Sequence, residues 1–277
     1  MDFAKRTTAK FILRILSGAF WRGVLAIAIF LIFWECGSRS NAWFGFAFPW
    51  VSQVPPPTAV LSEMFHLVQE GSFWMSALLS TARVFEGFIA AMVVGIPLGL
   101  AMAVSRIFYG ITFPVFEVLR PIPPLAWVPA SIIFWPTQEL SIAFVTFLGA
   151  FFTIVINVVG GAQAIDVRYF QAARSMGSST WDIFRRIILP GTLPSIVVGA
   201  TVGVGITWAV VVAAEMISGG GSSGSGGGLG FFIWNSYVGG SYTQIVAGMI
   251  SIGIAGYLSS VLLRQVGKLV TPWLYEA

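Results

Sequence analysis

Charged residues are scarce in this chain: they make up 9% of its 277 residues, whereas hydrophobic residues make up 57%. A soluble domain usually carries about 25% charged residues, so the composition excludes an ordinary water-soluble fold. The single cysteine, Cys36, excludes an internal disulfide framework, and the single histidine, His66, excludes a site with two imidazoles. We therefore expect neither a catalytic set nor a metal centre, and we expect His66 to be an interfacial polar residue. The chain also lacks G-x4-G-K-[ST], so it has no Walker A cradle for nucleotide phosphates.

Long uncharged runs are what the chain has instead. They cover residues 87–105, 121–138, 140–165 and 187–214, and a fifth apolar segment begins near Tyr242. About 20 apolar residues cross the ~30 Å hydrocarbon core of a bilayer as a helix, so each run is a candidate span.

Residues 19–36 form a sixth candidate span. A signal peptide is the alternative, but the apolar stretch that ends at Cys36 is longer than the usual signal-peptide core, and no small-residue cleavage site closes it. The sequence thus predicts an all-α membrane protein with about six transmembrane helices.

Basic residues predict the orientation of these helices. Twelve of the 15 Lys and Arg residues lie in segments 1–22 and 168–186, at Arg106, or at Arg264 and Lys268. The positive-inside rule places these segments, and both termini, in the cytoplasm.

We expect the chain to have two parts. The first comprises residues 1–80 and contains the N-terminal segment, the first span and an outer amphipathic segment. The second is a core of five transmembrane helices over residues 81–277.

Two connecting segments differ in character from the spans. Residues 163–186 are too polar to be embedded in the membrane, and Gly177 with its following hydroxyl residues predicts two short helices there. Trp181 and Phe184 in this cytoplasmic segment indicate a surface for a partner protein.

The second connecting segment is rich in glycine. Residues 219–230 comprise eight Gly, three Ser and one Leu, a composition that predicts an external loop acting either as a flap or as a tether.

The cytoplasmic segment also carries a spaced motif, Q-A-A-x3-G-x9-I-x-L-P, over residues 171–190. It resembles the EAA loop of ABC-importer permeases, E-A-A-x3-G-x9-I-x-L-P, with Gln171 in place of Glu. The resemblance implies a coupling helix that sits in a groove of an ATP-binding subunit. The coupling residues on this reading are Gln171, Ala172, Ala173, Gly177, Trp181, Phe184, Leu189 and Pro190.

A second motif narrows the resemblance. Residues 120–129, RPIPPLAWVP, are similar to the R-P-x-P-P-L-A-W-x-P segment of nitrate/sulfonate/bicarbonate/taurine importer permeases. Segments 214–216, 228–231 and 271–273 are similar to the same group, to its taurine branch especially. The resemblance implies the type I ABC importer permease fold in the bacterial inner membrane.

The same resemblance implies an assembly. Its parts are a homodimer of this chain, two ATP-binding cassette subunits that bind ATP and Mg²⁺, and a periplasmic or lipid-anchored substrate-binding protein. No cofactor is expected in this chain itself. The implied function is alternating-access import of taurine or an alkanesulfonate, with nitrate, bicarbonate or another small organic anion as alternatives.

Five residues are candidates for the translocation path or its gate. They are Arg120, Trp127, Asn157, Trp208 and Glu215. Each has a structural alternative: an ion pair with Glu117 for Arg120, solvation at a span end for Glu215, a hydrogen bond between helices for Asn157, and packing for the two tryptophans.

An ion-coupled secondary transporter or channel is the alternative function. It would need ionisable residues in the middle of its spans. Here the charges cluster at the ends of the apolar runs, which favours the ATP-driven importer.

Overall fold

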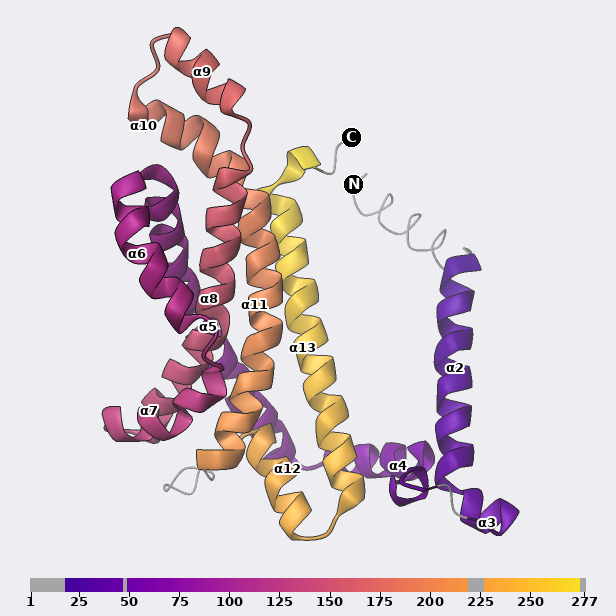
Figure 1. Ribbon diagram of the computed structural model, residues 1–277. Coiled ribbons are helices and arrows are strands. Elements are labelled where there is room, and N and C mark those ends of the chain that lie inside the picture. The colour runs from indigo at the N-terminus through magenta and orange to yellow at the C-terminus, as the bar shows by residue number, and fades with distance from the viewer. Residues whose placement is uncertain (1–17, 47–48, 219–226, 275–277) are drawn as a thin grey trace. The chain divides into compact units, whose positions relative to one another are not determined.

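The computed structural model describes residues 18–46, 49–218 and 227–274, which form helices joined by short turns and contain no strand (Figure 1). The all-α prediction is confirmed. Five helices in the described residues are long and apolar enough to cross a membrane. They are α2 (Gly18–Ser38), α5 (Gly71–Val104), α8 (Gln138–Gln163), α11 (Leu189–Ser218) and α13 (Tyr242–Val270).

Shorter elements connect these helices. They are α3 (Ser40–Phe44), η1 (Val51–Gln53), α4 (Pro57–Leu67), α6 (Arg106–Leu119), η2 (Pro124–Trp127), α7 (Val128–Phe134), α9 (Val167–Ser175), α10 (Thr180–Ile183), the π-helical turn η3 (Phe184–Ile188), α12 (Leu229–Val238) and η4 (Pro272–Leu274).

The chain divides into two units. The first comprises residues up to 69 together with 240–247, and the second comprises residues 70–239 together with 248–277. In the first unit, the Glu35 carboxylate at the end of α2 accepts hydrogen bonds from Arg39 and from the backbone N–H and hydroxyl of Thr58 at the start of α4. The predicted amphipathic helix is present as α4, with Leu61 and Phe65 exposed and Val60 buried.

Helix α8 is the centre of the second unit and packs along both α5 and α11. Glycines permit the close approach: a Cβ added at Gly87 of α5 would lie 2.2 Å from Oγ1 of Thr146 in α8. Likewise, a Cβ at Gly161 of α8 would lie 2.3 Å from Cβ of Ser195 in α11. Small residues at helix crossings are the usual means by which membrane helices pack.

Helix α5 begins at Gly71, earlier than the start of the uncharged run at Gly87. The extra turns carry Arg83, which is buried and paired with carboxylates, and the exposed Glu86, so charged residues lie inside this helix. The predicted limit of the N-terminal part at residue 80 thus falls inside this helix.

The candidate span over residues 121–138 is not one continuous helix. Helix α6 ends at Leu119, and the apolar helical stretch that follows the proline-rich turn covers only Pro124–Phe134. Proline lacks a backbone N–H donor, so Pro121, Pro123 and Pro124 interrupt the helical hydrogen bonds. The helical stretch after them is too short to cross a hydrocarbon core by itself.

Within the second unit, α9 and α10 extend beyond one end of α8 and α11, and α12 follows the opposite end of α11 (Figure 1). These two ends are called the α9–α10 end and the α12 end below.

Candidate functional site

The turn between α9 and α10 has the local chemistry that the sequence predicts. The Asp166 side chain caps α9 by accepting a hydrogen bond from the N–H of Arg168 at 2.8 Å. Gly177 follows α9 with φ of +77°, a left-handed conformation that favours glycine. The N–H of Ser178 then reaches back to the carbonyl of Ala173 at 3.0 Å, as in a Schellman cap. Two short helices are therefore confirmed in this segment.

Helix α10 is short but firmly capped. The Ser179 hydroxyl accepts a hydrogen bond from the N–H of Asp182 at 3.2 Å, and the Asp182 carboxylate accepts one from the N–H of Ser179 at 3.3 Å. This reciprocal pair is a capping box. The turn η3 continues from α10 into α11 without an intervening loop, with Pro190 in the first turn of α11. A displacement of α10 would therefore be passed directly to α11.

An apolar surface is exposed on this segment. Trp181 is 66% exposed, and its ring stacks on that of Phe184 with centroids 5.4 Å apart and an interplanar angle of 24°. Gln171 and Ala172 are also exposed, whereas Ala173 is only 5% exposed and so packs within this chain. Leu189 and Pro190 are half-buried. Of the two alanines of the motif, only Ala172 presents its methyl group outward.

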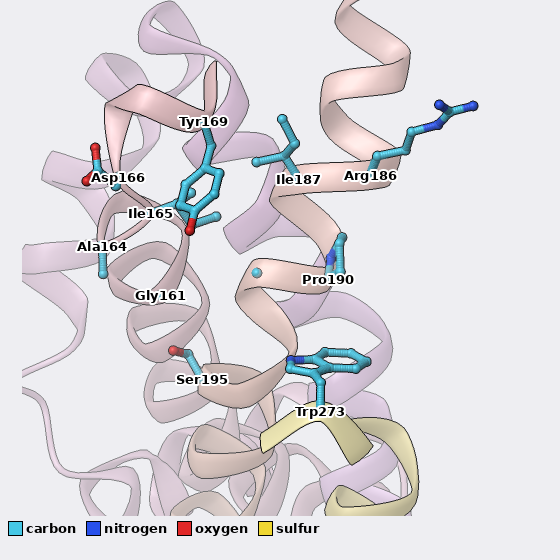
Figure 2. A pocket seen from close by; sticks show the side chains of 11 residues that line it. Gly161, Ala164, Ile165, Asp166, Tyr169, Arg186, Ile187, Pro190, Ser195 and Trp273 are labelled. Atoms are coloured by element: carbon cyan, nitrogen blue, oxygen red, sulfur yellow. The ribbon is translucent and has the colours of Figure 1, made fainter. Parts of the chain in front are cut away.

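A cavity of about 600 Å³ lies beside this surface (Figure 2). Its walls come from the end of α8, the start of α9, η3, the start of α11 and η4. Figure 2 shows Asp166 and Tyr169 on one side of it and Ser195 and Trp273 on the other. The 271–273 motif is thus brought to the same end of the unit as the 171–190 motif.

Arg120, a predicted path residue, lines a separate cavity of about 330 Å³. Thr153 of α8 and Ile206 of α11 line it as well, beside the proline-rich turn. Within the described part of the chain, no ion pair joins Arg120 to Glu117. Arg120 thus lies at a cavity whose other lining residues are largely apolar.

The other three aromatic or amide candidates contact other residues of this chain, and the Asn157 side chain bonds within its own helix rather than between helices. Trp127 packs edge-to-face on Phe144, with ring centroids 6.4 Å apart. Nδ2 of Asn157 donates to the carbonyl of Thr153 in its own helix at 2.8 Å. Trp208 is buried, and its Nε1 donates to the hydroxyl of Ser259 in α13 at 3.2 Å. The structure does not bring these three residues to the Arg120 cavity.

The interpretation of Glu215 as a solvated residue at a span end is wrong. Glu215 is 2% exposed, and its carboxylate accepts a hydrogen bond from Nη1 of Arg83 at 2.9 Å. The carboxylate also accepts from the Ser80 hydroxyl at 2.9 and 2.8 Å and from the N–H of Gly230 at 2.9 Å. A buried carboxylate requires such partners because desolvation is otherwise costly.

Arg83 is the functional candidate that sequence reasoning missed. Its side chain is 4% exposed and pairs with two carboxylates, that of Glu215 and that of Glu139 at the start of α8. Nε of Arg83 donates to Oε2 of Glu139 at 2.8 Å, and the Glu139 side chain is 56% exposed. The available signal in the sequence is that Glu139 and Glu215 directly border apolar runs and that Arg83 lies a few residues before another run.

Two glycines allow α12 to approach this ion-pair cluster. A Cβ added at Gly228 would lie 2.1 Å from Oε1 of Glu215, and one at Gly230 would lie 2.2 Å from the backbone oxygen of Val212. The N–H of Leu229 donates to the Ser80 hydroxyl at 2.8 Å. The end of the Gly-rich segment at 227–230 is therefore fixed on the bundle, while the remainder of the predicted flap or tether, residues 219–226, lies outside the described residues.

Comparison with known proteins gives consistent matches. Residues 95–275 match the family described as "Binding-protein-dependent transport system inner membrane component". A nitrate import permease of Synechocystis sp. is 34% identical over 260 residues, which cover 91% of this chain and 89% of the relative. The taurine transport system permease TauC of Escherichia coli is 31% identical, covering 79% of this chain and 80% of the relative.

Solved structures match as well. An inward-facing structure of the MetNI methionine ABC transporter has a TM-score of 0.61 and 22% identity, covering 76% of this chain and 98% of the matched chain. A bacterial ABC transporter that imports alginate has a TM-score of 0.57 and 12% identity, covering 98% of this chain. The predicted ABC importer permease fold is confirmed by these likenesses. Because the family match extends over residues 95–275, the chain belongs to the family of inner membrane components of binding-protein-dependent transport systems, and it is a multi-pass membrane protein.

Proposed function

We propose that this chain is the membrane-spanning subunit of an ATP-driven importer for a small anion. Family membership supports the importer, and the relatives named as nitrate, taurine and bicarbonate permeases, at 34%, 31% and 30% identity, support the anion. The sequence motifs favour taurine or an alkanesulfonate within this class. Nitrate and bicarbonate are the competing substrates in the experiment below.

The exposed Trp181 ring, stacked on the half-buried Phe184, is the observation that carries this proposal. Two capped helices hold it at the end of α8 and α11, where the positive-inside rule places the cytoplasm. Exposed, rigid aromatic side chains are the commonest anchors of protein interfaces. An ATP-binding cassette subunit that binds this pair would supply the Walker A site that this chain lacks, and with it ATP and Mg²⁺.

Movement of the two ATPase subunits would reach the membrane through η3. Because η3 continues directly into α11, closure of the ATPase dimer would shift α10 and α11 together. A second copy of this chain, related by a two-fold axis, would complete the translocation pathway. The pathway would then open alternately to a substrate-binding protein outside and to the cytoplasm inside.

Arg120 is the residue that we assign to anion passage. Its guanidinium has no carboxylate partner among the described residues and lies beside the cavity that contains Thr153. A guanidinium and a hydroxyl are the groups that bind an oxyanion by charge-assisted hydrogen bonds. Broken helices such as the turn after α6 are found where the backbone lines a cavity.

The test reconstitutes the chain with its ATPase and binding protein in proteoliposomes. Labelled taurine, nitrate and bicarbonate are offered in turn, and ATP-dependent uptake of one of them is expected. Trp181→Ala should reduce ATPase co-purification about ten-fold or more, since a central aromatic anchor contributes about 2 kcal/mol or more to binding. Trp43→Ala, at an exposed tryptophan in α3, is the matched control. Uptake without ATP, or full ATPase retention by Trp181→Ala, would contradict the proposal.

A further inference from the structure

A third cavity, of about 450 Å³, lies at the α9–α10 end and has no role in the proposal above. Its lining comes from the junction of α5 and α6, from the end of α8, from α9 and the turn after it, and from α10 and η3. The lining residues are Ala103, Val104, Arg106, Ala162, Phe170, Arg174, Ser178, Thr180, Ile183 and Ile188. Two arginines and two hydroxyl residues thus share one cavity with an aliphatic floor.

The two arginines of this cavity lack a counter-charge. Within the described part of the chain, neither the Arg106 nor the Arg174 guanidinium forms an ion pair, and no acidic residue lines the cavity. The two acidic residues of the nearby segment are engaged elsewhere, since Asp166 lies 3.9 Å from Arg168 and Asp182 lies 4.0 Å from Arg186. Asp182 is held by the Ser179 cap as well.

A cavity lined by charges of one sign favours a counter-ion of the other sign. Guanidinium groups bind phosphate-type oxyanions by paired, charge-assisted hydrogen bonds, and hydroxyl groups such as those of Ser178 and Thr180 can complete the coordination. We infer that Arg106 and Arg174, with Ser178 and Thr180, form a binding site for a phosphate-type oxyanion. The anion is either the headgroup of an anionic phospholipid or a free inorganic oxyanion.

The site joins two parts of the second unit that are far apart in the sequence. Arg106 is the first residue of α6, whereas Arg174 is in the last turn of α9, beside the turn at Gly177. A bound anion would neutralise both arginines and so hold the α5–α6 junction against the segment that leads into α10. Ala162, Ile183 and Ile188 add aliphatic surface to the lining, which suits the acyl chain of a phospholipid.

Binding can be measured without transport. The full-length chain, purified in a zwitterionic detergent, is melted in increasing sodium phosphate at constant ionic strength against sodium chloride. In a second arm it is melted with dioctanoyl phosphatidylglycerol against dioctanoylglycerol, which has the same acyl chains without the phosphate. A ligand that binds only the folded state raises the melting temperature in a saturable way. We expect saturation in at least one arm.

Variants identify the site. Arg106→Gln and Arg174→Gln should each weaken the apparent affinity about ten-fold or more, because each removes charge-assisted hydrogen bonds to the anion. Arg185→Gln, at an exposed arginine that does not line the cavity, should match the wild type. Saturation with phosphatidylglycerol alone identifies the lipid headgroup, and saturation with inorganic phosphate identifies a free anion; both support the site.

Three results would overturn the inference. The first is no saturable rise of the melting temperature in either arm for the wild type. The second is an equal loss of affinity in Arg185→Gln, which would indicate diffuse attraction by surface charge. The third is unchanged anion binding in Arg106→Gln and Arg174→Gln together with loss of ATPase co-purification, which would assign the two arginines to the ATPase interface.

Discussion

Replacement of Arg83 by glutamine should be the most damaging single change at the α12 end. Arg83 is 4% exposed and holds the carboxylates of Glu215 and Glu139, which belong to two other helices. In Arg83→Gln the Glu215 carboxylate stays buried with only Ser80 and the N–H of Gly230 as partners. A buried charge that loses its counter-charge destabilises a protein by about 3–5 kcal/mol, and we expect a loss of that size.

The structure also predicts the order of the other variants. Glu139→Gln should cost about 1 kcal/mol or less, because the Glu139 side chain is 56% exposed and Arg83 keeps Glu215 as its partner. Glu215→Gln should lie between the two, since a neutral amide can still accept a hydrogen bond from Gly230, and Arg83 keeps Glu139. The double variant Arg83→Gln with Glu215→Gln should be more stable than Arg83→Gln alone, because it leaves no uncompensated buried charge.

The measurement is the free energy of unfolding in mixed detergent micelles, followed by the loss of helical circular dichroism as denaturing detergent is added. All four variants are compared with the wild type under the same conditions. Equal destabilisation by Glu139→Gln and Arg83→Gln would refute the reasoning, as would a double variant less stable than Arg83→Gln. Either result would mean that burial of Glu215 does not depend on the Arg83 charge.

Three further predictions concern the motifs. Gly177→Val places a β-branched residue at φ of +77°, at a cost of about 1–3 kcal/mol, so ATPase co-purification should fall while total helix content is kept. Gly228→Ala should destabilise the α12 end by several kcal/mol, because its Cβ would lie 2.1 Å from Oε1 of Glu215. The control is Gly205→Ala, whose Cβ would meet nothing within 4 Å. Equal unfolding curves for the two variants would contradict the contact. Arg120→Gln should remove most anion uptake, and adding Glu117→Gln should not restore it because the described residues contain no ion pair between the two; rescue would show that a pair forms.

Features that depend on neighbouring residues could be predicted from the sequence. The apolar runs predict membrane-spanning helices because hydropathy over about 20 residues decides whether a helix is stable in lipid. The two short helices between α8 and α11 could be predicted because Gly177 and the Ser179 cap act within a few residues of the chain. The break after Arg120 comes from its prolines, which lack backbone N–H donors, and a count of uncharged residues alone does not show it.

Features that depend on distant residues could not be predicted in the same way. Arg83 and Glu215 are separated by 132 positions, so nothing local to either residue shows that the two charges neutralise one another. Helix α5 begins well before the uncharged run because a helix can contain charged residues: Arg83 is paired with carboxylates, and Glu86 is exposed. The burial of Ala173 beside exposed Ala172 also follows from the way that α9 packs rather than from the motif itself.

The two ends of the second unit differ in how completely one chain satisfies its own groups. At the α12 end, Arg83 has two carboxylates and Glu215 accepts four hydrogen-bond contacts, so the buried charges of this cluster are neutralised within one chain. At the α9–α10 end, Trp181 is exposed, and neither Arg106 nor Arg174 forms an ion pair in the described residues. Exposed aromatic rings and unneutralised charges are stabilised when another molecule covers them. If the proposed ATPase and the inferred anion bind at this end, their binding would stabilise exposed groups of the segment that continues through η3 into α11, and it would leave the paired charges at the α12 end unchanged.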